Sequence, residues 1–153
     1  MIVRLAQEAD LPAILGLASE VEQWFGSMVE DPGFRSSVEN HIRRSTALVT
    51  VAGSDLVGGL LFGGKAPVYR VHWLVVSEPN RGKGVGRGLM AEARRRFVRG
   101  PGCVEVITFG ADHPGAVAGG ARSFYESLGF VPAEAAVAGP EGGSRQVYRQ
   151  VLG

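Results

Sequence analysis

The chain has 153 residues, and its 16 basic and 15 acidic side chains give a net charge of +1. This length can close one hydrophobic core, so we expect a single domain over residues 1–153. The hydrophobic fraction of 45% excludes a disordered chain, and the balanced charge argues against a general binder of nucleic acids or membrane surfaces. The lone Cys103 excludes a disulfide framework and a multi-cysteine metal site. With no apolar run of signal-peptide or membrane-span length, we expect a cytoplasmic protein without a metal.

The first third of the chain predicts a strand followed by two helices. Residues 2–6 alternate apolar and polar side chains, which is typical of a strand. Asp10 and the following Leu-Pro pair mark a helix start, and helical spacing continues toward a glycine stop at position 26. A second, more polar helix is predicted over 32–44, again after an Asp-Pro pair.

The middle of the chain is rich in β-strand signals. Residues 47–52 and 56–62 are predicted to form a hairpin around the turn at 53–55. Residues 63–67 break the pattern with glycine and proline. A strong strand rich in β-branched and aromatic residues is then predicted over 69–76.

The last part predicts helices at 89–98 and 121–128, separated by a strand over 104–109. Gly129 occupies the position of a left-handed helix cap. A closing hairpin of 130–137 and 145–151 completes the order β-α-α-β-β-β-α-β-α-β-β. This order predicts an α/β fold of the mixed α+β kind, with a mostly antiparallel sheet of about seven strands flanked by about four helices.

A glycine-rich turn between the strand at 69–76 and the following helix carries the strongest functional signal. Its glycines allow positive φ and a close approach of the backbone to a ligand. The amides at the start of the helix lack intrahelical partners and favour anions. Arg81, Lys83 and Arg87 add positive charge in the same turn. A diphosphate is therefore the ligand that this turn suits best.

Two common nucleotide motifs fit this turn poorly. A Walker motif needs Ser or Thr after Gly-Lys, whereas Gly84 follows Lys83. A dinucleotide-binding motif could be read from Gly86, but the acidic residue expected about 20 positions later is not clear, and an antiparallel hairpin precedes the turn. A connector without a ligand is the remaining alternative, although it would need neither four glycines nor three cations.

A third pattern fits better. The Arg81-x-x-Gly84-x-Gly86 motif directly after a strand resembles the coenzyme A loop of the GNAT family of N-acetyltransferases. The segment 121–130, which reads ARSFYESLGF, is similar to that family's last helix and its Tyr-x-x-x-Gly-Phe ending. The resemblance covers most of the chain in the right order. It implies a GNAT-like fold and direct acetyl transfer from acetyl-CoA to a primary amine in a ternary complex.

The resemblance also implies which residues bind the coenzyme and stabilise the reaction. A backbone amide of the fourth strand would donate to the developing oxyanion, and by position this is Val75 or Val76. The expected coenzyme-binding residues are Leu74, Val75, Val76, Arg81, Gly82, Lys83, Gly84, Val85, Gly86 and Arg87.

Three side chains are candidates for proton transfer. Tyr125 matches the family's acid for the leaving thiolate; the alternative is a core aromatic residue. His72 is the candidate base, because simple alternation aligns it with Leu74 and Val76, and the alternative is a histidine bonded within the sheet. Glu78 is a second candidate for the base.

The acceptor site is less defined by the sequence. Aromatic residues at 24, 25, 34 and 73 with acidic residues at 20, 22 and 31 could bind a cationic amine, but a core and a solvated helix face explain them at least as well. The asparagine that many relatives carry before the last helix is absent from 116–120.

The expected partners are a small-molecule or peptide amine and, by resemblance, a second copy of the chain in a homodimer. A coenzyme A sensor without catalysis and, less favoured, a nucleotide-dependent oxidoreductase are the alternative functions.

Overall fold

The computed structural model describes residues 1–22, 28–113, 120–138 and 142–152. Its helices and strands follow the predicted order along the chain. They are β1 Ile2–Leu5, α1 Leu11–Ser19, α3 Pro32–Arg43, β2 Ala47–Ala52, β3 Asp55–Lys65, β4 Val68–Val76, α4 Val85–Phe97, β5 Gly102–Phe109, α6 Ala121–Ser127, β6 Val131–Ala136 and β7 Arg145–Leu152, with short 3-10 turns at Glu8–Asp10 and Glu78–Asn80.

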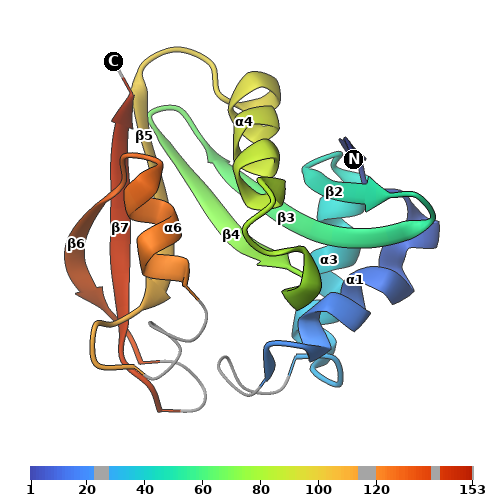
Figure 1. Cartoon of the computed structure of the whole chain (residues 1–153). Coiled ribbons are helices and arrows are strands. Elements are labelled where there is room, and N and C mark those ends of the chain that lie inside the picture. Colours follow the sequence, from blue (N-terminus) through green and yellow to red (C-terminus); the bar gives the residue numbers. More distant parts are fainter. Residues whose placement is uncertain (23–27, 114–119, 139–141, 153) are drawn as a thin grey trace.

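The seven strands form one sheet in the order β1-β2-β3-β4-β5-β7-β6. All neighbouring pairs are antiparallel except β4 and β5. Helices α4 and α6 pack on one face over a core that includes Leu89 and Tyr125, while α1 and α3 cover the N-terminal half of the other face (Figure 1). The predicted mixed, mostly antiparallel fold is confirmed.

Strands β4 and β5 separate part-way along their length. They pair only from Val68 with Cys103 to Val71 with Val106. Beyond these pairs β4 continues alongside β3 to Val76, and β5 continues alongside β7 to Phe109. The centre of the sheet therefore opens toward the ends of β4 and β5 (Figure 1).

A β-bulge in β4 changes which residues share a face. Leu61 pairs with Trp73 and Phe62 pairs with Val71, so His72 is an extra residue in β4. The extra residue reverses the alternation beyond it. Leu74 then packs on the core under α4, as Val71 does, whereas Trp73 packs against the helices of the other face. The predicted alignment of His72 with Leu74 and Val76 is wrong for this reason.

The starts of the first two helices differ in how they are capped. The Asp31 carboxylate accepts the Gly33 amide at 2.9 Å, which confirms the predicted start of α3. Asp10 precedes α1, but its carboxylate instead bonds Arg4 at 2.8 and 3.0 Å and the Gln7 amide at 2.7 Å. Asp10 thus ties β1 to the helix start and does not cap α1.

Helix α1 is shorter than predicted and ends at Ser19. The Glu20 and Val21 amides bond carbonyls three residues back, at 3.2 Å each, so the chain tightens into a 3-10-like turn. The predicted stop at position 26 lies outside the described residues.

Two elements with glycine-rich ends are longer than the sequence predicted. Strand β3 continues through Gly63 to Lys65, where the sequence predicted a break after 62. Gly63 leaves room in β3 for the His72 ring, which a Cβ at this position would overlap. Helix α4 begins at Val85 rather than 89, since Gly84 takes the left-handed conformation that initiates it.

The end of α6 agrees with its sequence signal. Gly129 has φ 95°. The Gly129 amide donates to Glu126 O and the Phe130 amide to Tyr125 O, each at 3.0 Å. These bonds satisfy carbonyls of the last helical turn and direct the chain into β6.

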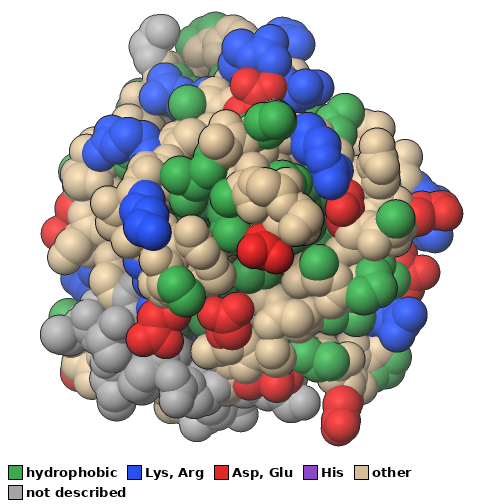
Figure 2. Space-filling view, turned by 45° about the vertical axis from the view of Figure 1, so that its right-hand side comes forward, with side chains coloured by type: hydrophobic (Ala, Val, Ile, Leu, Met, Phe, Trp, Pro, Cys, Tyr) green, Lys and Arg blue, Asp and Glu red, His purple; other side chains and the backbone are tan. Residues whose placement is uncertain are grey.

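Basic and acidic side chains are interspersed on the face shown in Figure 2, as the net charge of +1 suggests. Arg95 and Arg96 near the end of α4 both bond Glu92. Among the helices of the described ranges, none combines the length and apolarity that a membrane crossing requires.

Thr50 on β2 is fully buried, and its hydroxyl has no hydrogen-bond partner among the described residues. We expect Thr50→Val to raise the free energy of unfolding by up to about 1 kcal/mol, because it removes an unsatisfied buried hydroxyl. Urea denaturation measures this change. The matched control is Thr46→Val, which should be destabilising because the Thr46 hydroxyl bonds His41 Nδ1 at 2.7 Å. A loss of stability in Thr50→Val would contradict the prediction.

Candidate active site

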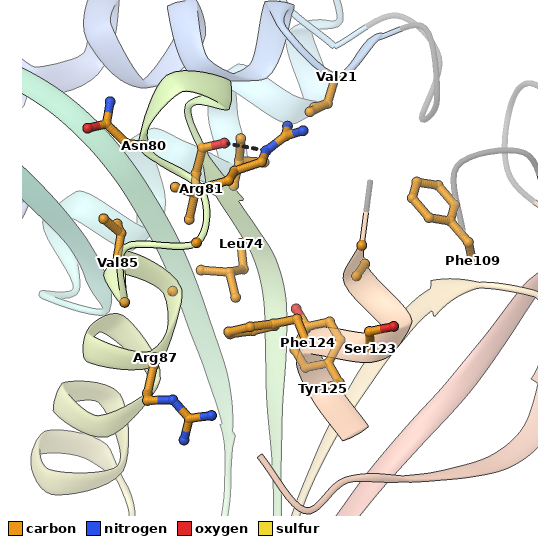
Figure 3. A pocket seen from close by; sticks show the side chains of 17 residues that line it. Val21, Leu74, Asn80, Arg81, Val85, Arg87, Phe109, Ser123, Phe124 and Tyr125 are labelled. Atoms are coloured by element: carbon orange, nitrogen blue, oxygen red, sulfur yellow. Dashed lines mark hydrogen bonds between the residues drawn. The ribbon is translucent and has the colours of Figure 1, made fainter. Parts of the chain in front are cut away.

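A cavity of about 530 Å³ lies where β4 and β5 separate. One wall comes from the end of β4, the glycine-rich turn and the start of α4. The other wall comes from the end of β5 and from α6, so that Phe124 and Tyr125 lie across the cavity from Arg81 and Val85 (Figure 3). The described lining residues are Val21, Leu74, Val75, Val76, Asn80, Arg81, Gly82, Gly84, Val85, Gly86, Arg87, Phe109, Gly120, Ala121, Ser123, Phe124 and Tyr125.

The cavity is lined from both faces of the sheet. Leu74 and Tyr125 belong to the core on the α4 and α6 side. Val21 and Val75 belong to the core under α1, on the opposite side. The gap between β4 and β5 therefore allows two ligands to approach one point from opposite faces of the sheet.

The glycine-rich turn presents backbone amides to this cavity. Gly82 and Gly84 have φ of 76° and 83°, which strongly favours glycine. The first intrahelical bond of α4 runs from the Gly88 amide to Gly84 O at 2.9 Å. The amides of the preceding first turn have no intrahelical acceptor, and they lie at the positive end of a 13-residue helix. This arrangement suits a diphosphate.

Gly86 has a packing role that the sequence did not indicate. A Cβ at Gly86 would lie 2.9 Å from the Phe124 ring of α6. The glycine thus allows α4 and α6 to approach each other beside the cavity. Arg87 adds a second contact between these helices, since its Nη2 donates to Ser127 Oγ at 3.3 Å.

Nine of the ten predicted coenzyme-binding residues line the cavity, and Lys83 is the exception. Lys83 is exposed in the turn. Arg81 lines the cavity, and its Nε donates to Val76 O at 3.2 Å (Figure 3). The guanidinium is therefore held at the rim and adds positive charge there.

The direction of the Val76 peptide groups follows from the register of β4. The Ser77 amide donates to Val57 O of β3 at 2.9 Å. Successive residues of a strand direct their backbone groups to opposite sides, so the N–H and C=O of Val76 point away from β3 and toward the gap. The Val75 amide points toward β3. Of the two predicted oxyanion donors, Val76 is the one whose amide faces the cavity.

Tyr125 lies on α6 and is buried, with its ring edge-on to Phe124 and Phe130. Burial raises the pKa of its phenol above the usual value. The hydroxyl therefore keeps its proton throughout the neutral pH range, where it can serve as an acid.

The two candidate bases do not line the cavity. His72 lies on the face covered by α3, and its Nδ1 is 3.1 Å from His41 Nε2. His41 Nδ1 in turn contacts Thr46 Oγ1 at 2.7 Å, while the Thr46 hydroxyl donates to His41 O at 3.3 Å. These bonds assign the proton to Nδ1 of each ring. His72 thus bonds a side chain of α3, whereas the alternative interpretation expected a bond within the sheet.

Glu78 is exposed in the 3-10 turn after β4. Its backbone amide donates to Glu20 Oε1 at 3.2 Å, so this position ties the turn to the end of α1. No carboxylate and no histidine is found among the described lining residues.

Most residues suggested for an acceptor site have structural partners instead. The Glu22 carboxylate accepts the amides of Met28 and Val29 at 2.6 and 3.0 Å, and these two bonds lower its pKa. Phe34 packs edge-on against Trp73 with ring centroids 5.7 Å apart. The candidates at 24 and 25, and residues 116–119, lie outside the described residues.

Sequence reasoning did not assign several lining residues, among them Val21, Asn80, Phe109 and Ser123. Phe109 and Val21 are ordinary apolar residues, and only the divergence of β4 from β5 brings them to one cavity. Ser123 lies in the segment 121–130 and could have been found from its place beside Phe124. Across the described ranges, no three His, Cys, Asp or Glu side chains gather as possible metal ligands.

Comparison with known sequences gives one family. The family model described as an acetyltransferase (GNAT) domain matches residues 43–132, more than half of the chain. This range includes β4, the glycine-rich turn, α4 and α6. No curated protein matches the chain by sequence.

Solved structures agree with the fold over nearly the full chain. A ribosomal-protein-alanine N-acetyltransferase from Brucella melitensis has a TM-score of 0.74 at 23% identity, covering 99% of this chain and 100% of that one. A GNAT-family acetyltransferase from Bacillus cereus has 0.73 at 12%, covering 98% and 96%. The PaiA N-acetyltransferase from Thermoplasma acidophilum, solved with coenzyme A, has 0.72 at 17%, covering 99% and 98%. At these identities the likeness shows the fold alone.

The histidine pair predicts a pH dependence of stability. Burial, with smaller effects of His72 and Arg44, lowers the pKa of His41 to about 4, and burial followed by Arg70 lowers the pKa of His72. Both pKa values lie below that of a histidine in the unfolded chain, which is near 6.5. The unfolded chain therefore binds more protons than the folded chain at mildly acidic pH. The two neutral histidines contribute fully to the free energy of unfolding above about pH 6.5, and this contribution is lost as pH falls toward 4.

We therefore expect the double variant His41→Gln, His72→Gln to lose less stability than the wild type when the pH falls from 7 to 5. Each histidine takes up at most about one proton on unfolding, which limits the difference between the two proteins. Urea denaturation at the two pH values measures the difference. An unchanged pH dependence in the double variant would contradict this assignment.

Proposed function

The chain belongs to the GNAT acetyltransferase family, and from this premise we propose that it transfers an acetyl group from acetyl-CoA to the amine of a small molecule or peptide. The observation that carries the proposal is the cavity at the separation of β4 and β5, lined by the glycine-rich turn and open to both faces of the sheet. A coenzyme can enter beside α4 and α6 while an amine enters beside α1.

The turn supports the coenzyme half of the proposal. The left-handed Gly84 and the free amides at the start of α4 suit the diphosphate, with Arg81 at the rim. A Cβ added at Gly84 would meet no protein atom within 4 Å, so the space beside this glycine is available to a ligand. The coenzyme A in the similar Thermoplasma structure is consistent with this use.

The reaction requires that the amine nitrogen attack the thioester carbonyl and that the carbon–sulfur bond break. We assign the Val76 amide as the donor to the oxygen that gains negative charge, because it faces the gap. Tyr125 gives its proton to the leaving thiolate from the opposite wall, and the proton that the nitrogen loses on forming the amide returns to the Tyr125 phenolate. Neither His72 nor Glu78 is given the role of base, since neither lines the cavity.

The test combines binding and turnover. Acetyl-CoA should bind the wild type in calorimetry, and a panel of amines assayed by free-thiol release should identify acceptors. Gly84→Ala should weaken acetyl-CoA binding by about tenfold or more, because the new Cβ enters the diphosphate site.

Gly100→Ala is the matched control for Gly84→Ala. Gly100 has φ 77° and open space beside it, so the backbone strain is comparable, but it does not line the cavity. Equal loss of affinity in both variants, or no binding of acetyl-CoA by the wild type, would contradict the proposal. Binding without thiol release for any amine would favour a sensor over an enzyme.

Tyr125→Phe should lower kcat by about 100-fold and leave the KM for acetyl-CoA nearly unchanged, because the variant keeps the ring and loses the acid. Tyr69→Phe is the control, since the Tyr69 hydroxyl bonds Arg99 away from the cavity and should not affect kcat. A parallel loss of binding and turnover in Tyr125→Phe would indicate a packing role instead.

A further inference from the structure

The wall that carries Tyr125 is held by a polar network that centres on Arg122. Arg122 Nη1 donates to Phe109 O at 2.9 Å and to Gln146 Oε1 at 2.7 Å. Its guanidinium carbon also lies 5.0 Å from the centre of the Tyr148 ring. One side chain of α6 thus contacts the last residue of β5 and two residues of β7.

The bond to Phe109 compensates for the separation of the strands. The Gly110 amide donates to Ser144 O beside β7, at 2.9 Å. The N–H and C=O of one trans peptide point in opposite directions, so the Phe109 carbonyl points away from β7, toward the gap that β4 has left. Arg122 supplies the donor that a continuing β4–β5 ladder would have provided.

The same network extends to the edge of the sheet. Gln146 Nε2 donates to Ala133 O at 2.9 Å, within the part of β6 where the register with β7 shifts. Tyr148 is fully buried, and its hydroxyl donates to Glu126 Oε2 at 2.9 Å, one helical turn after Arg122. Helix α6 is therefore fixed to β5, β7 and, through Gln146, β6.

We propose that Arg122 is a positioning residue, which sets the place of Tyr125 and Phe109 opposite β4 and thereby the width of the cavity. This proposal rests on the proposed acetyl transfer for its catalytic consequence. Arg122 does not line the cavity, so it acts through the two lining residues. Without it, the Phe109 carbonyl and the Gln146 amide lose a charged donor, and α6 can shift relative to β4.

The kinetic test compares three variants under conditions where circular dichroism shows them folded. Arg122→Met should lower kcat by about 10- to 100-fold with little change in the KM for acetyl-CoA, because the phosphate-binding turn is on the other wall. Arg122→Lys, which keeps the charge and donates from a single nitrogen, should recover part of kcat. Arg145→Met is the matched control: Arg145 also donates to two carbonyls, those of Val137 and Ala138, but it does not line the cavity or contact α6 in any described bond.

A spectroscopic test is independent of catalysis. The chain has three tyrosines, so fluorotyrosine labelling gives three resonances that Tyr→Phe variants assign. Arg122→Met should shift or broaden the Tyr125 signal while Tyr69 stays unchanged as the reference; Tyr148 should shift in any case, because Arg122 covers its ring.

The outcomes separate the two proposals. An unchanged Tyr125 signal, or kcat within about twofold of the wild type in folded Arg122→Met, would overturn the positioning role. If the wild type itself transfers no acetyl group, the proposed function fails, and the Tyr125 signal alone decides the role of Arg122. If kcat falls equally in Arg145→Met, the effect is general and the positioning role is also overturned.

Discussion

The separation of β4 from β5 after Val71 is the feature on which the rest of this structure depends. A continuous sheet would have no opening between its two faces, and every backbone group of β4 would pair with a neighbouring strand. Because the two strands part, the backbone groups of Val76 on one side and the Phe109 carbonyl on the other side face a gap. The gap is at once the cavity and a place where backbone groups need partners other than a neighbouring strand.

The two walls of the gap are held by different means. On the β4 side, Arg81 bonds Val76 O, and the Glu20 carboxylate bonds the turn. On the β5 side, Arg122 bonds Phe109 O. The walls approach each other where Gly86 meets Phe124, since a Cβ at position 86 would lie 2.9 Å from the Phe124 ring. In this chain, arginines thus bond the backbone carbonyls at both edges of the gap, and a glycine lets the two walls approach each other.

A glycine in this chain can serve a ligand, a neighbouring ring or a helix end, and the sequence does not distinguish among these uses. Gly84 adopts a left-handed φ and lies beside open space. Gly86 instead leaves room for the ring of Phe124, which comes from a helix about 40 positions later in the chain. Gly63 is similarly needed for the ring of His72. The excess of glycine therefore indicated special backbone positions, while the neighbouring rings at Gly86 and Gly63 became visible only in the tertiary structure.

The sequence by itself determined the order of the elements, the mixed and mostly antiparallel fold and the family, and it indicated the glycine-rich turn that lines the cavity. These depend on local periodicity, helix-end signals and a motif whose residues are close together in the chain. Tertiary structure alone decided that His72 faces α3 and bonds His41, because one bulge residue reversed the alternation of β4. It also decided that Phe109 and Val21 line the cavity, and that Arg122 bridges β5 and β7. Those contacts join residues far apart in sequence, and they exist only because two neighbouring strands diverge, for which no local pattern gives a signal.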